Sequence, residues 1–211
     1  MPNGNAPGMV LRECLQAAIA APSVHNTQPW LFRVWPGGVD IYADRARALP
    51  VIDPRGRELM ISVGAAAFNL RVAVLARGRM PVQELLPDPR NPDLAVRITV
   101  GPHTAVPETA RRLAQAIPHR PTNRRPFSAV LVPSYVLSEL ADAAAAETGT
   151  LILANQEARE AVLSVVRTAE NRWRNDPAYW RELKVWTSEQ PERCDGIPTA
   201  AFGPWSALEV V

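Results

Sequence analysis

The sequence predicts an α+β fold in which an antiparallel or mixed sheet is flanked by helices. Long segments repeat apolar residues at helical spacing, and shorter segments alternate apolar and polar residues as strands do. These segments follow one another without regular strand–helix–strand alternation, which argues against a doubly wound parallel sheet. The chain has 211 residues, 47% of them hydrophobic, so it can form one sizeable core or two small domains.

The first hundred residues contain clear helix and strand patterns. Apolar spacing predicts a helix that Pro22 ends and a longer, mostly apolar helix that stops at Gly78. Alternation predicts three strands, the first two joined as a hairpin. The expected elements are a helix over 9–21, strands at 31–35 and 39–43, a turn at 53–56, a helix over 57–77, a proline-rich connection at 81–92 and a strand at 94–100.

The second half of the chain is mainly helical by pattern. Proline at the first turn and an acid near the positive end of the dipole mark one helix start at Pro107-Glu108. The expected elements are helices over 107–117 and 134–147, a short strand at 150–154, and two helices between 156 and 186. Four aromatic residues gather near the break between the last two helices: Trp173, Tyr179, Trp180 and Trp186. After Pro191 we expect irregular chain.

Composition and charge exclude several classes of function. A net charge of +2 resembles neither a nucleic-acid footprint nor a polybasic membrane surface. Two distant cysteines, Cys14 and Cys194, argue against a disulfide framework and a zinc ribbon, and the three histidines lack metal-ligand spacing. Asn69 and Arg71 interrupt the longest apolar segment, and the N-terminus lacks a signal-peptide pattern. We therefore expect a cytoplasmic protein with no metal site.

A polar loop at residues 21–30 is the first candidate site. It places Ser, His, Asn, Thr and Gln between a predicted helix and a predicted strand. Pro22 and Pro29 stiffen its ends, because proline fixes φ and restricts the residue before it. A rigid polar loop on a packed scaffold suits ligand binding. The alternative is a helix exit whose side chains only satisfy the local backbone.

A second polar cluster lies a hundred residues later. Arg120, Thr122 and Arg124 alternate, so in an extended segment they point to one side. Two guanidiniums and a hydroxyl match a phosphate monoester through charge-assisted hydrogen bonds. The alternative is a solvated basic turn in an arginine-rich chain. No Walker A, GxGxxG, HExxH or GxSxG pattern is present.

The two clusters together resemble the signatures of a known family. Pro22-Ser23-x-x-Asn26-x-Gln28-Pro29-Trp30 is similar to the PSxxNxQPW motif of FMN-dependent nitroreductases. Arg120-x-Thr122-x-Arg124 resembles the family's RxSxR phosphate element, with Thr in place of Ser. The order of the motifs is reversed, which looks most like the Acg-type branch, where two such units are fused. Three further segments support that likeness: Ser-Val-His-Asn, Asp-Pro-x-Gly-Arg and Arg-Arg-Pro-Phe.

The resemblance, over residues 9–190, implies a bound FMN. Arg120, Thr122 and Arg124 match phosphate-contacting positions. Four loop residues match positions that reach the flavin from the partner unit: Pro22, Ser23, Val24 and Asn26. Gln28 matches the motif as a further contact.

The implied activity is that of an FMN-dependent oxidoreductase. It would pass hydride from NAD(P)H to FMN and electrons to a small-molecule acceptor, nitroaromatic or quinone-like. The cofactor performs the redox step, so no catalytic side chain is named. Two alternatives stay open: a flavin-binding or sequestering protein with little turnover, and a nonfunctional fragment.

The resemblance also implies a domain organisation. It makes 9–105 a first nitroreductase-like unit and 106–211 the Arg120 element with the start of a second unit. Residues 1–8 are rich in Gly, Pro and Asn and are expected to be disordered. Acg-type chains continue well past this length, so the second unit is expected to be incomplete. The assembly would be a monomeric pseudo-dimer or a homodimer.

Overall fold

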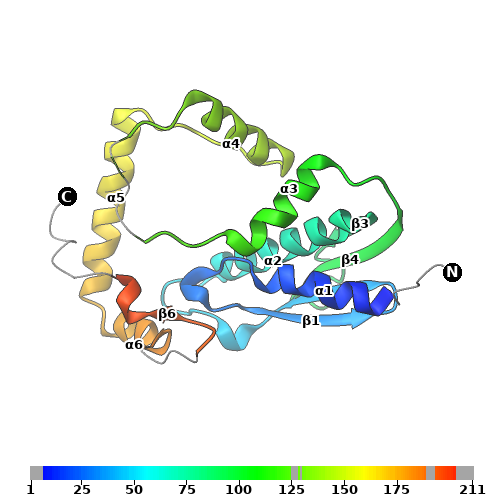
Figure 1. Ribbon diagram of the computed structural model, residues 1–211. Helices are drawn as coiled ribbons and strands as arrows, with labels where there is room; N and C mark the ends of the chain where they lie inside the picture. The colour runs from blue at the N-terminus through cyan, green and yellow to red at the C-terminus, as the bar shows by residue number, and fades with distance from the viewer. Residues whose placement is uncertain (1–6, 125–127, 129, 189–192, 203–211) are drawn as a thin grey trace. The chain divides into compact units, whose positions relative to one another are not determined.

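The computed structural model describes residues 7–124, 128, 130–188 and 193–202 (Figure 1). They fall into two compact units, one reaching Asn123 and resuming at Arg181, the other spanning Arg124–Trp180. The predicted α+β class, with an antiparallel sheet flanked by helices, is confirmed. The predicted division into family-like units at residue 105 stays a prediction. Residues 7 and 8 of the predicted disordered end begin helix α1 (Pro7–Ile19), so the prediction is wrong there. The rest of that end and part of the Arg-Arg-Pro-Phe segment lie outside the described residues.

The first unit is built on a four-stranded antiparallel sheet with the order β1-β2-β4-β3. Its strands are β1 (Trp30–Trp35), β2 (Gly38–Ala43), β3 (Arg79–Leu85) and β4 (Leu94–His103). The predicted hairpin is confirmed, with Trp35 opposite Gly38. A Cβ on Gly38 would lie 2.1 Å from the Ile98 carbonyl oxygen of β4, so the close strand approach requires glycine there.

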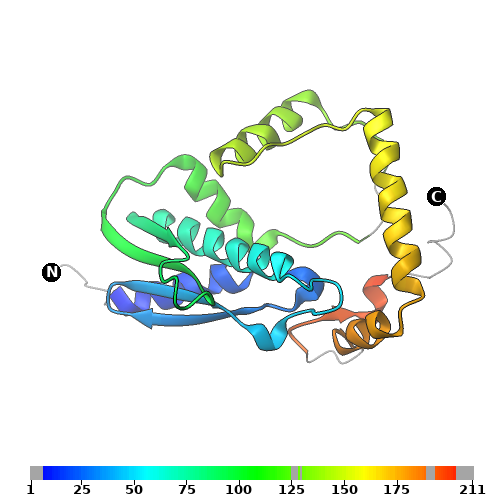
Figure 2. The same cartoon turned by 180° about the vertical axis from the view of Figure 1, so that it is seen from behind.

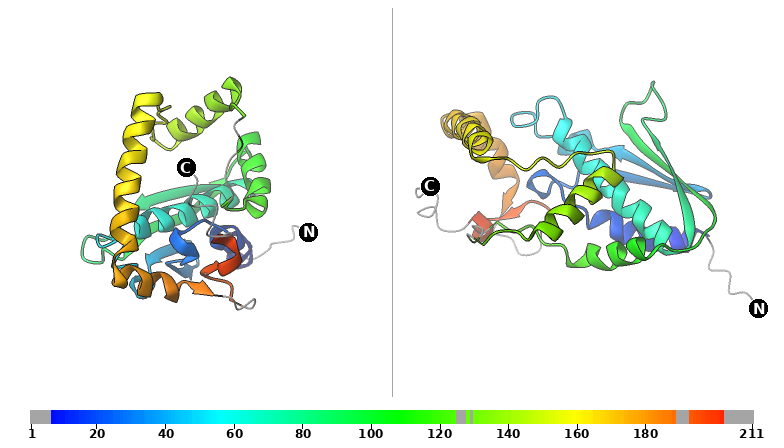
Figure 3. Two further views of the ribbon diagram at one scale, coloured as in Figure 1. Left: turned by 90° about the vertical axis from the view of Figure 1, so that its left-hand side faces the viewer. Right: turned by 90° about the horizontal axis from the view of Figure 1, so that it is seen from above.

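Three helices accompany this sheet: α1 (Pro7–Ile19), α2 (Arg57–Ala76) and α3 (Glu108–Ala116). Asp53 starts α2 by accepting a hydrogen bond from the Leu59 backbone N–H at 2.9 Å. The core lies between α1, α2 and one face of the sheet, and Figures 2 and 3 show both helices alongside the strands. Val63 and Leu70 of α2 and Ile41 of β2 are fully buried there. Alpha-helix α2 is long and apolar enough to cross a membrane, and over half of it is buried inside the protein.

The opposite face of the sheet carries a row of charges in register. Arg33 of β1 lies opposite Asp40 of β2, which lies opposite Arg97 of β4. The Asp40 side chain is fully buried and accepts hydrogen bonds from Arg33 (2.5 Å), Trp35 (3.3 Å) and both Nε and Nη2 of Arg97 (2.7 and 2.9 Å). The bonds from Arg97 and Arg33 lower the pKa of Asp40 to about 2.

Two sequence predictions about strands are wrong. The predicted connection at 81–92 begins as strand β3, which tolerates Pro81 because β3 is an edge strand with a register shift beside that residue. The strand predicted at 150–154 is not formed, and its residues are exposed without a strand partner among those described. An apolar run forms a strand only where a neighbouring strand completes its hydrogen bonds.

The second unit contains helices α4 (Ser134–Ala146) and α5 (Gln156–Arg174) and the start of α6 (Pro177–Val185). The predicted break between the last two helices is confirmed, and Trp173 stacks on Tyr179 beside it. Trp186, which the sequence groups with these aromatic residues, is buried and belongs to the first unit. The chain after α6 also has order that the sequence did not predict, since β5 (Thr187–Ser188) pairs in parallel with β6 (Ile197–Pro198).

Candidate cofactor site

The polar loop follows α1 and contains one turn of 3-10 helix, η1 (Val24–Asn26). Ser23 stabilises the loop through both its backbone carbonyl and its side-chain hydroxyl. Its carbonyl oxygen accepts the Asn26 N–H at 3.0 Å, and its hydroxyl oxygen accepts the Gln28 N–H at 2.9 Å. The Val24 N–H donates to the Ser62 hydroxyl of α2 at 3.3 Å, so the loop is tied to the core helix.

The loop backbone is unusual in three places. His25, Asn26 and Gln28 have φ values of 51°, 53° and 49°. Left-handed backbone costs free energy in residues that carry a Cβ, and it persists where surrounding contacts enforce it. Thr27, Pro29 and Trp30 are buried and fix the loop to the core, whereas Pro22 is exposed.

Arg120 lies beside the start of this loop. It follows α3 and the 3-10 turn η3 (Ile117–His119). Its Nη2 donates to the Ala20 carbonyl oxygen at 3.3 Å, and its Nη1 donates to the Thr122 hydroxyl at 3.4 Å. The fold thus brings Arg120 next to the polar loop and Thr122 beside Arg120. Arg124 belongs to the second compact unit.

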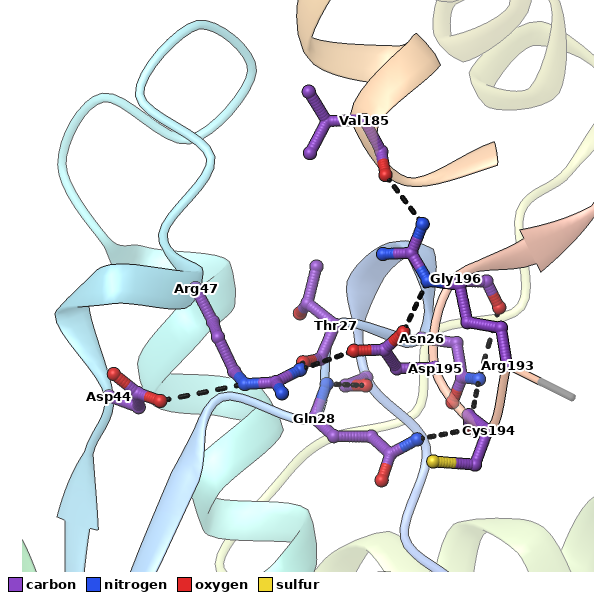
Figure 4. A network of polar contacts seen from close by, with 11 residues as sticks. Asn26, Thr27, Gln28, Asp44, Arg47, Val185, Arg193, Cys194, Asp195 and Gly196 are labelled. Atoms are coloured by element: carbon purple, nitrogen blue, oxygen red, sulfur yellow. Dashed lines mark hydrogen bonds and ion pairs between the residues drawn. The ribbon is translucent and has the colours of Figure 1, made fainter. Parts of the chain in front are cut away.

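The side chains of Asn26 and Gln28 contact residues 193–197, a stretch we call the docking segment (Figure 4). Asn26 Nδ2 donates to the carbonyl oxygens of Gly196 at 3.0 Å and Cys194 at 3.5 Å. Gln28 Nε2 donates to the Cys194 carbonyl oxygen at 2.7 Å, and the Gly196 N–H donates back to the Asn26 carbonyl oxygen. Both amides that the sequence assigns to the flavin therefore also hold a distant part of the chain.

Arg47 joins the loop to the docking segment from a third element, the 3-10 turn η2 (Arg45–Arg47). Its Nη1 donates to the Thr27 carbonyl oxygen at 2.8 Å and to Asp195 Oδ2 at 2.7 Å. Arg193 also bonds Asp195, and Arg193 and Arg47 together lower the pKa of that carboxyl group. Both guanidiniums lie over the ring of the buried Trp186, at 5.5 Å for Arg193 and 5.9 Å for Arg47.

The sequence did not predict the contacts of Arg47 and Asp195 that hold the loop. Nothing local separates Arg47 from the many other arginines of the chain, and Asp195 lies in a stretch predicted to be irregular. The one usable signal is Asp195-Gly196, a turn dipeptide. Gly196 indeed has φ of 79°, and a Cβ there would lie 2.8 Å from the Trp186 carbonyl oxygen.

The described residues contain no group of three or more His, Cys, Asp or Glu placed to hold a metal ion. The polar groups around the loop are amides, hydroxyls, guanidiniums and the Asp195 carboxylate. Guanidiniums and hydroxyls bond phosphate oxygens, and amides bond the polar edges of heterocycles.

Comparison with known proteins finds relatives in Mycobacterium tuberculosis. The chain is 35% identical over 178 residues to a protein of strain H37Rv whose name begins "Putative NAD(P)H nitroreductase", covering 84% of this chain and 51% of that protein. It is 31% identical over 202 residues to "Putative NAD(P)H nitroreductase acg" of the same strain, covering 96% of this chain and 61% of that protein. The chain is similar to part of each of these proteins. It spans about half the length of the first relative.

Two further comparisons complete the picture. No protein-family model matches the chain. A solved structure described as a nitroreductase family protein from Streptococcus pneumoniae TIGR4 aligns with a TM-score of 0.38 and 17% identity, over 61% of this chain and 86% of that one. A likeness at this level carries no argument about the site.

Proposed function

We propose that the chain is an FMN-dependent oxidoreductase of the nitroreductase type. It takes hydride from NAD(P)H and passes electrons to a small nitroaromatic or quinone-like acceptor. The names of the relatives from Mycobacterium tuberculosis support the reaction class, and the two motif-like clusters support the cofactor. Bound FMN supplies the redox chemistry, and the protein supplies binding and orientation.

The observation that carries the proposal is the hydrogen bond from Arg120 to the Ala20 carbonyl oxygen. It brings a cationic group to within reach of a polar loop that lies a hundred residues away in sequence. A ligand with a phosphate at one end and a polar ring at the other matches this pair of groups. Neither cluster alone indicates more than a capped helix end or a solvated basic turn.

The residues present fit the cofactor chemically. Arg120 makes two weak hydrogen bonds, of 3.3 and 3.4 Å, and a guanidinium has five N–H donors, so donors remain for a phosphate. The Thr122 hydroxyl adds a donor, and both side chains are exposed. The assignment of Arg124 to the phosphate stays a prediction from the sequence. In the proposed site the loop residues 22–28 face the flavin ring.

The binding test is a titration of the purified chain with FMN, followed by quenching of flavin fluorescence. We expect a 1:1 complex. Arg120→Ala should weaken binding by about tenfold or more, since a hydrogen bond to a charged group contributes about 1.5–3 kcal/mol. Arg112→Ala is the matched control, because it removes an equally charged and exposed arginine from α3. Equal affinity of the Arg120 and Arg112 variants would refute the phosphate assignment.

The redox test is anaerobic addition of NADH or NADPH to the FMN complex. We expect the flavin absorbance to bleach and to recover when a nitroaromatic or a quinone is added. FMN that stays oxidised under both nucleotides would contradict the oxidoreductase and leave a flavin-binding protein without turnover. Absence of FMN binding would contradict the cofactor itself.

A further inference from the structure

We propose that Arg47 and Asp195 are positioning residues for the polar loop, and that they act on flavin binding through Thr27, Asn26 and Gln28. This inference rests on the proposed function, because it assumes that the loop faces the flavin ring. Neither residue belongs to either motif-like cluster. The fold of the first unit brings them together with the loop from three separate parts of the chain.

The loop needs outside support because its backbone is strained. Three of the four residues from His25 to Gln28 are in the left-handed region, and none of them is glycine. Each such residue costs on the order of 1 kcal/mol, since the Cβ approaches the following carbonyl. The hydrogen bonds that Ser23 and Val24 accept come from residues of the same loop, so they close the turn without joining it to another element. The conformation therefore depends on partners elsewhere in the chain.

Arg47 supplies one of these partners directly. A single terminal nitrogen of its guanidinium bonds the Thr27 carbonyl oxygen and Asp195 together, at 2.8 and 2.7 Å. Thr27 is buried, so its carbonyl lies at the point where the loop meets the core. Arg47 also contacts Asp44 at 3.5 Å, which fixes the side chain from its other side.

Asp195 supplies the second partner by holding the docking segment in place. Its carboxylate lies between Arg47 and Arg193, and its side chain is only 18% exposed. The carbonyl oxygens on either side of it, those of Cys194 and Gly196, accept the amide hydrogens of Gln28 and Asn26. Fixing the carboxylate thus fixes the two acceptors that orient the loop amides (Figure 4).

These contacts join the loop, η2 and the docking segment in one connected network. Arg47 bonds the loop backbone and the carboxylate, the docking segment bonds the loop side chains, and Trp186 packs under both guanidiniums. Removing the side chain of Arg47 or of Asp195 breaks the ion pair between them, and with it this network. The double substitution should therefore cost less than the sum of the two single substitutions, because both singles remove the same ion pair.

The test measures affinity for both FMN and riboflavin in Arg47→Ala, Asp195→Ala and the double variant. We expect each to weaken binding of both ligands by about tenfold, the cost of losing one hydrogen bond to a charged group. Affinity lost through the loop that faces the flavin ring must fall equally for FMN and riboflavin, because the two ligands share that ring. Arg120→Ala should instead weaken FMN alone, because riboflavin has no phosphate. A general loss of structure would not separate the two classes of variant.

The matched control is Arg45→Ala. Arg45 lies in the same 3-10 turn and makes an ion pair of the same 2.7 Å length, but with Asp93 and not with the loop. We expect its affinities to equal those of the unsubstituted chain. Gly196→Ala is a second route to the same effect, because its Cβ would displace the docking segment without changing charge.

The loop conformation can also be measured in the protein without flavin, by amide hydrogen exchange. Amide hydrogen exchange at Asn26 and Thr27 should become about tenfold faster in Arg47→Ala, since their N–H bonds depend on the loop conformation. If the unsubstituted chain binds FMN and Arg47→Ala binds it as Arg45→Ala does, the positioning role is refuted while the proposed function stands. Tighter binding in Asp195→Ala would also refute it, because the docking segment would then compete with the flavin. If the unsubstituted chain binds neither flavin, both the proposed function and this inference fail.

Discussion

Replacing Asp40 with Asn tests the charged row on the open face of the sheet. Asp40 is fully buried and accepts four hydrogen bonds, three of them from two arginines. The amide of Asn keeps the volume but removes the charge and turns donors toward the guanidiniums. Breaking a fully buried ion pair costs about 3–5 kcal/mol, and here water reaches both arginines, so we expect a loss of about 2–3 kcal/mol at pH 7.

The pH dependence gives the sharper signature. The folded-state pKa of Asp40 is lowered from 3.8 to about 2, so its ionisation stabilises the fold above pH 3.8 and the benefit is lost as pH falls through 2. The difference corresponds to about 2.4 kcal/mol, of which about 1 kcal/mol is lost by pH 3 and about 2 kcal/mol by pH 2.

Urea unfolding at pH 7 and pH 3, followed by circular dichroism, measures both effects. The unsubstituted chain should lose about 1 kcal/mol more than Asp40→Asn over this range. Glu84→Gln is the control, because it removes an exposed carboxylate in register with Arg97 and should change stability little. An Asp40→Asn variant that matches the Glu84→Gln variant at pH 7, or that keeps the pH dependence of the unsubstituted chain, would refute the reasoning.

Three further predictions concern the first unit. Gly38→Ala should destabilise the fold by about 3 kcal/mol in urea unfolding, because its Cβ meets a backbone oxygen that cannot move aside. Leu70→Ala should cost about 2–5 kcal/mol, since the side chain is fully buried in the core, whereas Ile61→Ala on the same helix, which is 53% exposed, should cost much less. Cys194 should react with a thiol reagent in the native protein, and Cys14 only after unfolding, because burial hides the Cys14 thiol and raises its pKa. Mass spectrometry of the labelled chain would show any early reaction at Cys14, which would contradict the buried placement.

Local pattern was sufficient for most of the fold. The helix over 57–77, the hairpin and the break before Pro177 depend on periodicity, turn residues and proline, which act within a few residues. Strand β3 was missed because Pro81 and the prolines that follow the strand suggested a connection, and an edge position with a register shift is visible only once the partner strand is known. The strand predicted at 150–154 failed for the reverse reason, since apolar sequence alone supplies no partner.

The candidate site divides in the same way. The polar loop and the Arg120 cluster could be found from residue type and spacing, because each is contiguous in sequence. The bond between Arg120 and Ala20 could not, since it depends on how α3 returns to the end of α1. The pairing of Arg47 with Asp195 could not be predicted, because 148 residues separate them and only the Asp195-Gly196 turn dipeptide marks the second residue.

The most direct test of the cofactor site is the ratio of riboflavin to FMN dissociation constants in the unsubstituted chain and in Arg120→Ala. The phosphate is the only difference between the ligands, so the ratio isolates the contribution of Arg120 and Thr122 from that of the loop. We expect the unsubstituted chain to prefer FMN by about tenfold or more, and Arg120→Ala to lose most of that preference. Equal affinity of the unsubstituted chain for both ligands, or an unchanged preference in Arg120→Ala, would contradict the assignment of this site to a flavin phosphate.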